Sequence, residues 1–97
     1  MGVKFAKEYA LIMDDLTRAL QDVEDVQEAL GMEPEDWGGL NDDEKAECLR
    51  TLADDVFYAL GADPVMEIGL ATVTYDKGNH VIRLAHPDKV VRIVHLL

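Results

Sequence analysis

Three histidines near the carboxyl terminus, His80, His86 and His95, are the side chains whose chemistry first suggests a metal site. In the strand pairing expected below, His80 and His95 lie directly opposite each other, with Thr74 on the neighbouring strand. Zinc takes a third and usually a fourth protein ligand, but the sequence places no carboxylate or thiolate where it would complete the site. The nearest candidate, Asp76, lies two residues beyond Thr74. We therefore expect half-exposed, hydrogen-bonded histidines at the sheet end, and we predict no metal and no cofactor. A small metal protein using His80 and His95 is the alternative.

The residue types that serve nucleophilic catalysis are sparse in this chain. It contains no serine, which excludes serine triads. Cys48 has no histidine near it in the sequence, so we interpret it as a small packing residue. The adjacent carboxylate pairs 14–15, 42–43 and 54–55 diverge by about 100° on a helix, which does not place two carboxylates in one cleft. We predict a protein that is not an enzyme.

The distribution of charge is the most informative feature of the sequence. The net charge is −11, and residues 1–61 hold sixteen Asp or Glu against five Lys or Arg. Residues 62–97 hold four of each. A strong negative field repels phosphates, so we expect no direct binding to nucleic acid or to an anionic membrane.

The acidic residues of the expected helices are the best candidate for a functional surface. Anions near a helix C-terminus oppose the helix dipole, and a sequence that breaks this rule repeatedly uses those residues for another purpose. We predict a face that binds a basic protein, as an inhibitor that mimics nucleic acid or as an immunity-type protein. A solvated face that serves solubility only is the alternative. The predicted partner-binding residues are Asp14, Asp15, Asp22, Glu24, Asp25, Glu28, Glu47, Asp54 and Asp55.

Two helices are expected in the first two thirds of the chain. Apolar residues recur with a heptad spacing over residues 3–30, which predicts one long helix that Gly31 ends. Asn41 and Glu44 resemble a capping box, which predicts a second helix over 42–60. Between them, Pro34 can begin a single helical turn, and Trp37 is expected to cover the core; an exposed Trp37 that anchors a partner is the alternative.

Residues 65–97 predict a three-stranded antiparallel meander. The apolar period falls to two from Val65 onward. A three-residue hairpin loop is expected within Tyr75–Asn79, with Gly78 left-handed, and a second tight turn is expected at His86–Lys89. A register with residue 72 opposite 82 and residue 84 opposite 91 places six residues on the face of the sheet that packs against the helices: Ile68, Leu70, Ile82, Leu84, Val91 and Ile93. The other face then carries a predicted homodimer contact: Val73, Val81, Val94 and Leu96.

These elements define one domain, 1–97, of the α+β class, with two antiparallel helices packed on the meander in the order ααβββ. One cysteine excludes an internal disulfide, and no apolar run approaches the length of a membrane span. We therefore expect a cytoplasmic protein. A structural homodimer, with acidity serving solubility only, is the second interpretation of its role.

Overall fold

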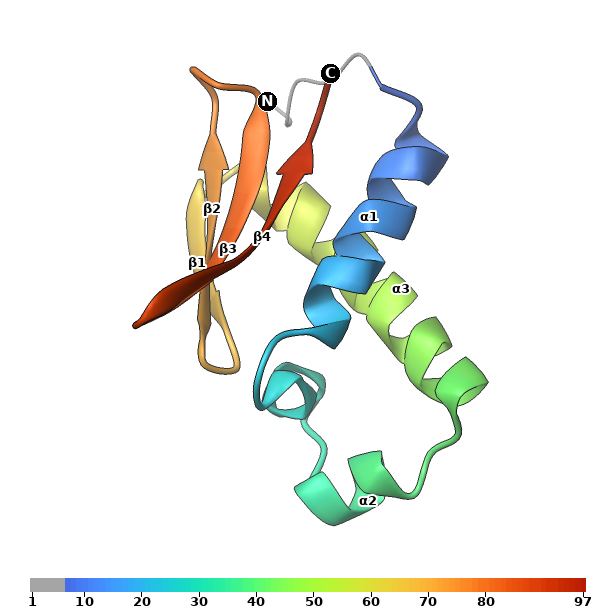
Figure 1. Ribbon diagram of the computed structural model, residues 1–97. Coiled ribbons are helices and arrows are strands. Elements are labelled where there is room, and N and C mark those ends of the chain that lie inside the picture. The colour runs from blue at the N-terminus through green and yellow to red at the C-terminus, as the bar shows by residue number, and fades with distance from the viewer. Residues whose placement is uncertain (1–6) are drawn as a thin grey trace.

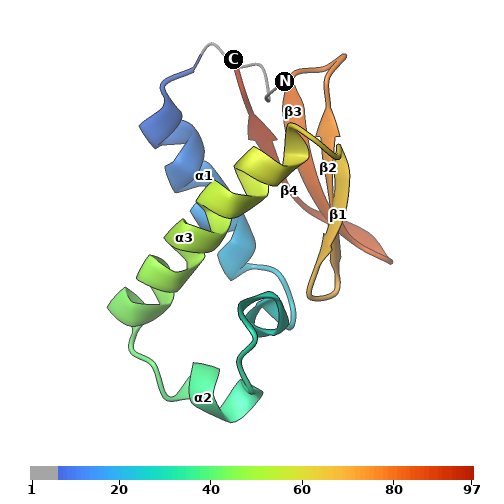
Figure 2. The same ribbon diagram turned by 180° about the vertical axis from the view of Figure 1, so that it is seen from behind.

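The computed structural model describes residues 7–97 and has two layers, with helices on one face of an antiparallel sheet (Figure 1). The view from behind shows the same arrangement, with α3 crossing α1 (Figure 2). The predicted α+β class, with helices before strands, is confirmed. The sheet, however, has four strands in the order β1-β2-β3-β4, and three were predicted.

The first helix, α1, spans Tyr9–Gln21 and is much shorter than predicted. After Gln21 the chain turns through Asp25, which is left-handed with φ of 60°, into a short 3-10 helix, η1, over Val26–Leu30. The predicted helical residues 3–6 lie outside the described residues. The prediction of one continuous helix over 3–30 is therefore wrong.

Tertiary contacts explain why the helix breaks although its apolar period continues. Val23 and Val26 are buried, so the heptad pattern correctly marks the core positions on both sides of the break. The backbone of Glu24 instead bonds to the sheet: its N–H donates to Nε2 of His86 at 3.1 Å, and its carbonyl accepts from Leu70 N–H at 3.0 Å. Carboxylates clustered after α1 also weaken a helix at this end.

The two helices that follow agree closely with those predicted from the sequence. A short helix, α2, spans Pro34–Gly38 with Pro34 in its first turn. The longest helix, α3, spans Asp42–Leu60 and begins with the predicted capping box, in which Asn41 and Glu44 each accept from the other's backbone N–H. Six apolar residues of α3 face the core, namely Leu49, Leu52, Ala53, Val56, Phe57 and Leu60.

The sheet contains a tight turn that the sequence analysis missed. The strands are β1 (Val65–Ile68), β2 (Ala71–Asp76), β3 (Val81–His86) and β4 (Lys89–His95). Ile68 pairs with Ala71, so Gly69 and Leu70 form a two-residue hairpin, and Gly69 has a φ of +56°. A glycine with positive φ at the first central position is typical of such turns.

The predicted pairing of the later strands is also wrong. Tyr75, not Thr72, lies opposite Ile82, and the left-handed residue of this loop is His80 with φ of 56°, not Gly78. Leu84 pairs with Arg92, one position beyond the predicted partner, and a bulge follows between Leu84 and Ala85. The tight turn at Pro87 and Asp88 is confirmed, because His86 pairs with Lys89.

These shifts exchange much of the sheet's inner and outer face. Val73, Val94 and Leu96 lie in the core, and Val81 is half-buried, so the predicted homodimer contact through these four residues is wrong. The register differs from the prediction by three residues between β2 and β3 and by one between β3 and β4. A shift by an odd number of residues moves side chains to the other face, which is the physical reason for the error. Of the six residues predicted to face the helices, Ile68, Ile82 and Leu84 are buried, Val91 is half-buried, and Leu70 and Ile93 are exposed.

Candidate functional site

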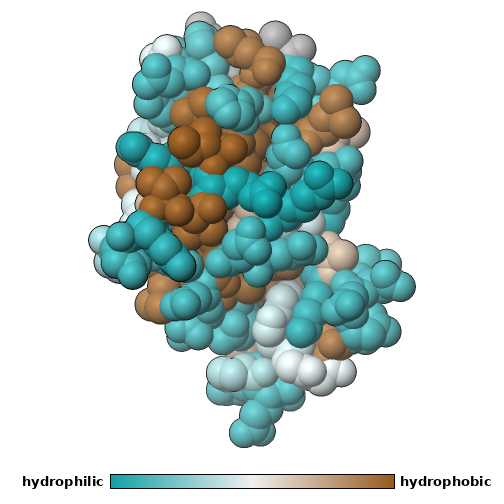
Figure 3. Space-filling model, in the orientation of Figure 1, coloured by the Kyte–Doolittle hydropathy of each residue, from teal (hydrophilic) through white to brown (hydrophobic). Residues whose placement is uncertain are grey.

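Residues 24–47 form an acidic lobe at the end of the molecule that lies opposite the C-terminus (Figure 1). The acidic lobe comprises η1, α2, the connecting loops and the first turns of α3, and it holds ten Asp or Glu and a single cation, Lys45. Hydrophilic residues cover most of this end of the molecule in the space-filling view (Figure 3). The larger apolar patches in the same view lie over the sheet. The negative charge of the chain is therefore concentrated in one place.

Three of the predicted partner-binding residues lie outside the lobe and are paired with cations of the same chain. Nη1 of Arg50 lies 2.5 Å from Asp14, and Nζ of Lys7 lies 3.1 Å from Asp15. An Nη of Arg92 lies 3.7 Å from Asp22. These ion pairs partly neutralise the acidic face that was predicted along the first helix.

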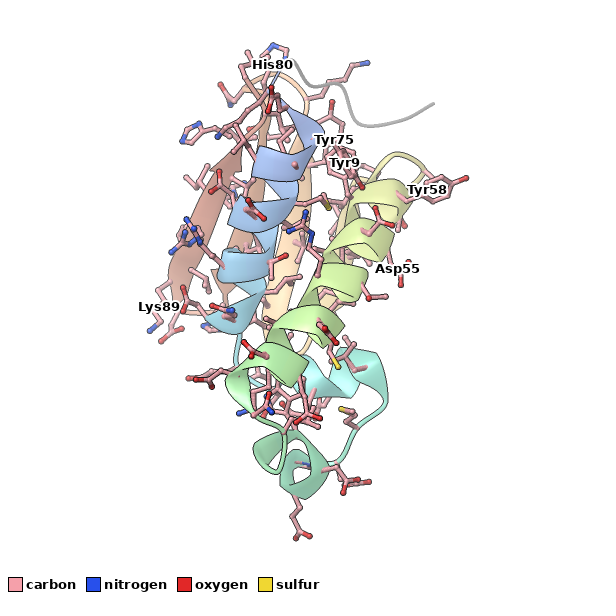
Figure 4. All side chains as sticks on the ribbon, turned by 90° about the vertical axis from the view of Figure 1, so that its right-hand side faces the viewer. Tyr9, Asp55, Tyr58, Tyr75, His80 and Lys89 are labelled. Atoms are coloured by element: carbon pink, nitrogen blue, oxygen red, sulfur yellow. The ribbon has the colours of Figure 1, made fainter. Side chains whose placement is uncertain are left out.

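Asp54 and Asp55 lie on α3, also outside the lobe. Asp54 accepts a hydrogen bond from the Tyr9 hydroxyl. Asp55 is exposed and projects away from α3 together with Tyr58 (Figure 4). The structure therefore does not bring all nine predicted residues together.

The other four predicted residues, Glu24, Asp25, Glu28 and Glu47, lie in the lobe and are exposed. Among residues 7–97, none of these four carboxylates forms an ion pair. The sequence analysis missed six further members, and the run of carboxylates around a single lysine was the signal that could have revealed them. They are Glu33, Glu35, Asp36, Asp42, Asp43 and Glu44.

A pocket of about 600 Å³ opens where the acidic lobe meets the core, between the end of α1, η1, α2 and the start of α3. Its apolar part is formed by three buried core residues, Val23, Val26 and Leu49, and by Trp37. Its polar part is formed by Gln21, Asp25, Gln27, Asp42 and Lys45. Ligand pockets commonly combine an apolar wall with a few polar groups, and this volume falls in their usual range.

Trp37 links the pocket to the core. Its ring packs against the core, as predicted for a covering residue, and Nζ of Lys45 lies 5.6 Å from the ring centroid. This distance is within the range of a cation–π interaction. The face of Trp37 is therefore already used to hold a cation.

The histidines do not come together as a site. His95 pairs with Val81, and the carbonyl of His80 accepts from Leu96 N–H, so the predicted opposition of His80 and His95 is wrong. His86 is buried and bonds to the backbone of Glu24. In residues 7–97, no group of three or more His, Cys, Asp or Glu side chains is arranged to hold a metal ion. Cys48 is half-buried on α3.

Two groups outside the pocket have shifted pKa values. Partial burial, the hydrogen bond to Asp54 and the charge of Asp54 raise the pKa of Tyr9 to about 12. Hydrogen bonds from the Asn79 side chain and backbone lower the pKa of Asp76. These shifts arise from burial and from hydrogen bonds to single partners, and not from a cluster of reactive groups.

No family model matches the chain, and no curated protein or solved structure is significantly similar to it. Within the described residues, no helix has the length and apolar character needed to cross a bilayer.

Proposed function

We propose that this chain is a small, non-enzymatic interaction protein whose acidic lobe binds a basic surface on another protein. A lobe of this charge competes with a nucleic-acid backbone for a basic groove, so the partner is a protein that itself binds nucleic acid. The single cysteine suits a reducing compartment, and we propose that the two proteins meet in the cytoplasm.

The observation that carries this proposal is the ten carboxylates and one cation of residues 24–47. Like charges this dense repel one another and oppose the compact state. On α1 and at its C-terminal end, Lys7, Arg50 and Arg92 pair with carboxylates, whereas no ion pair between residues 7–97 involves a carboxylate of the lobe. A device for solubility alone has no need to gather unpaired charge at one end, whereas a surface for a basic partner does.

The proposal is tested by removing charge from the lobe without changing its shape. We choose Asp25→Asn, Glu28→Gln and Glu35→Gln, because these three side chains are exposed and Asn tolerates the left-handed backbone of residue 25. The matched control neutralises three exposed carboxylates outside the lobe with Asp55→Asn, Asp63→Asn and Glu67→Gln. Both triple variants have the same net charge.

Binding is measured by titrating each protein with a nona-arginine peptide at several salt concentrations. Each exposed charge pair contributes up to about 1 kcal/mol, so we expect the lobe variant to lose about tenfold or more in affinity at low salt. The control should lose much less. Equal losses in the two variants would show that only net charge matters and would refute a specific role for the lobe. Capture from a lysate with the same three proteins then identifies the basic partner.

A further inference from the structure

We propose that the pocket of the acidic lobe receives one arginine side chain of the basic partner. This inference rests on the proposed function and deepens it, because it names the residue that the lobe recognises. The pocket offers an aromatic face at Trp37, carboxylates at Asp25 and Asp42, and a buried amide at Gln27. These are the groups that a planar, cationic side chain with several N–H donors requires.

Gln27 is the observation that separates this pocket from a simple acidic patch. The residue is only 6% exposed, yet it lines the pocket. Within residues 7–97, the side-chain amide of Gln27 forms no hydrogen bond. Every fully shielded polar side-chain atom in the same range has a hydrogen-bond partner, so the Gln27 amide is not fully shielded. The amide therefore reaches the pocket, where it offers one acceptor oxygen and two donors.

The amide of a largely buried side chain has room for few water partners, and a ligand in the pocket can replace them with direct hydrogen bonds. Methionine would fill the same space but could not form such bonds. The presence of glutamine at this position is explained if its amide oxygen accepts a hydrogen bond from a ligand in the pocket. A guanidinium group supplies such donors in a fixed plane.

Lys45 shows that the aromatic face of the pocket can hold a cation. Its ammonium group lies over the Trp37 ring at 5.6 Å, so a cation of the chain itself occupies the aromatic face. An incoming arginine stacks its flat guanidinium on that ring and displaces the flexible lysine side chain. A planar guanidinium stacks better on an aromatic ring and loses less hydration than an ammonium, so the pocket prefers arginine to lysine.

The apolar wall of the pocket packs against the methylene stem of the incoming arginine. Val23, Val26 and Leu49 are buried core residues whose surfaces line the pocket. The methylene stem of an arginine can cover such a wall while its charged head reaches the carboxylates. The volume of about 600 Å³ also leaves room for the adjoining peptide backbone.

The first test uses three small probes: acetyl-arginine methylamide, its neutral analogue acetyl-citrulline methylamide, and acetyl-lysine methylamide. Trp37 is the only tryptophan, so its fluorescence and its indole N–H resonance report on the pocket without labelling. We expect the arginine probe to bind at least fivefold more tightly than the citrulline and lysine probes. It should also shift the side-chain amide resonances of Gln27. Equal binding of the arginine and citrulline probes would overturn the inference.

The second test uses Gln27→Met, which keeps the size and net charge of the pocket. We expect this variant to bind the arginine probe at least fivefold more weakly. Gln21→Met is the matched control, because Gln21 also lines the pocket but is exposed. That control should change binding less than twofold. A Gln27→Met variant that binds the arginine probe like the wild type would overturn the inference.

The third test removes the competing lysine. Lys45→Met should strengthen arginine binding severalfold, whereas Lys77→Met, which removes an exposed lysine from the distant β2–β3 loop, should strengthen it much less. Equal gains in the two variants would show that only net charge changed.

The failure of this inference can be distinguished from failure of the proposed function. If the lobe triple variant loses nona-arginine binding but Gln27→Met does not, the lobe binds basic partners without an arginine pocket. If the arginine probe binds in the pocket while the lobe and control triple variants bind nona-arginine equally, the pocket stands and the proposal for the lobe fails.

Discussion

Gly69 packs directly against the carbonyl of Glu24, so that a hairpin of the sheet holds the segment that follows α1. A Cβ atom on Gly69 would lie 2.4 Å from the Glu24 oxygen, closer than any real contact of this kind. The N–H of the next residue, Leu70, donates to the same oxygen at 3.0 Å. The turn and the end of the helix are therefore built against each other, and neither could form in this geometry alone.

Gly69→Ala should destabilise the protein strongly. The new methyl group meets backbone atoms, which cannot move away easily, and the positive φ of residue 69 is strained for alanine. We expect a loss of about 3 kcal/mol in the free energy of unfolding, measured by urea denaturation. Gly38→Ala is the control, because a Cβ at residue 38 meets nothing within 4 Å. A Gly69→Ala variant as stable as this control would contradict the close approach.

His86→Ala should also destabilise the protein, because it removes the acceptor for Glu24 N–H. His86 is buried in β3, and its Nε2 lies 3.1 Å from that nitrogen. Leaving a partly buried donor unpaired, together with the lost packing, costs about 1–3 kcal/mol. The exposed His95 on β4 provides the comparison, and His95→Ala should change stability by less than about 0.5 kcal/mol. Similar effects of the two substitutions would argue against this hydrogen bond.

The elements that the sequence predicted well are those whose boundaries are set by local contacts. The capping box of Asn41 and Glu44 begins α3 where the sequence places it, and Pro34 begins the short helix α2. Both signals depend on backbone groups within a few residues. The elements that were missed depend on distant partners: the break after Gln21 requires His86 and Leu70, and these contacts are not visible in the helical period.

The candidate site shows the same division. The excess of carboxylates could be read from the sequence, and Glu24, Asp25, Glu28 and Glu47 do lie together in the lobe. The pocket could not be predicted, because it exists only where the helix breaks and η1 turns Gln27 inward beside Trp37. The ion pairs that neutralise residues 14, 15 and 22 could not be predicted either, since two of the three cations come from distant elements.

Tyr9 should ionise at an unusually high pH. Partial burial and the hydrogen bond to Asp54 raise its pKa from 10.0 to about 12, so the folded state favours the neutral phenol. The resulting stabilisation is fully present below pH 10 and is lost as the pH rises through 12. An absorbance titration should therefore show a tyrosine step near pH 12, and Tyr9→Phe should remove that step. Asp54→Asn should move the step to lower pH; an unchanged step would exclude Asp54 as a cause.

Asp76 should stabilise the β2–β3 loop only where it is ionised. Its carboxylate accepts from the backbone N–H of Asn79 at 3.2 Å and from the side-chain amide at 2.7 Å, and these bonds lower its pKa from 3.8. A lowered pKa in the folded state gives stability that is present above pH 3.8 and is lost as the pH falls through the folded value. Asp76→Ala should therefore lower the melting temperature at pH 7, and the difference from the wild type should shrink in acid. Asp63→Ala in the α3–β1 connection serves as a control for simple removal of a surface charge, since the Asp63 carboxylate accepts from Val65 N–H at a longer 3.3 Å. A difference between Asp76→Ala and the wild type that stays constant from pH 7 to pH 2 would contradict the assignment.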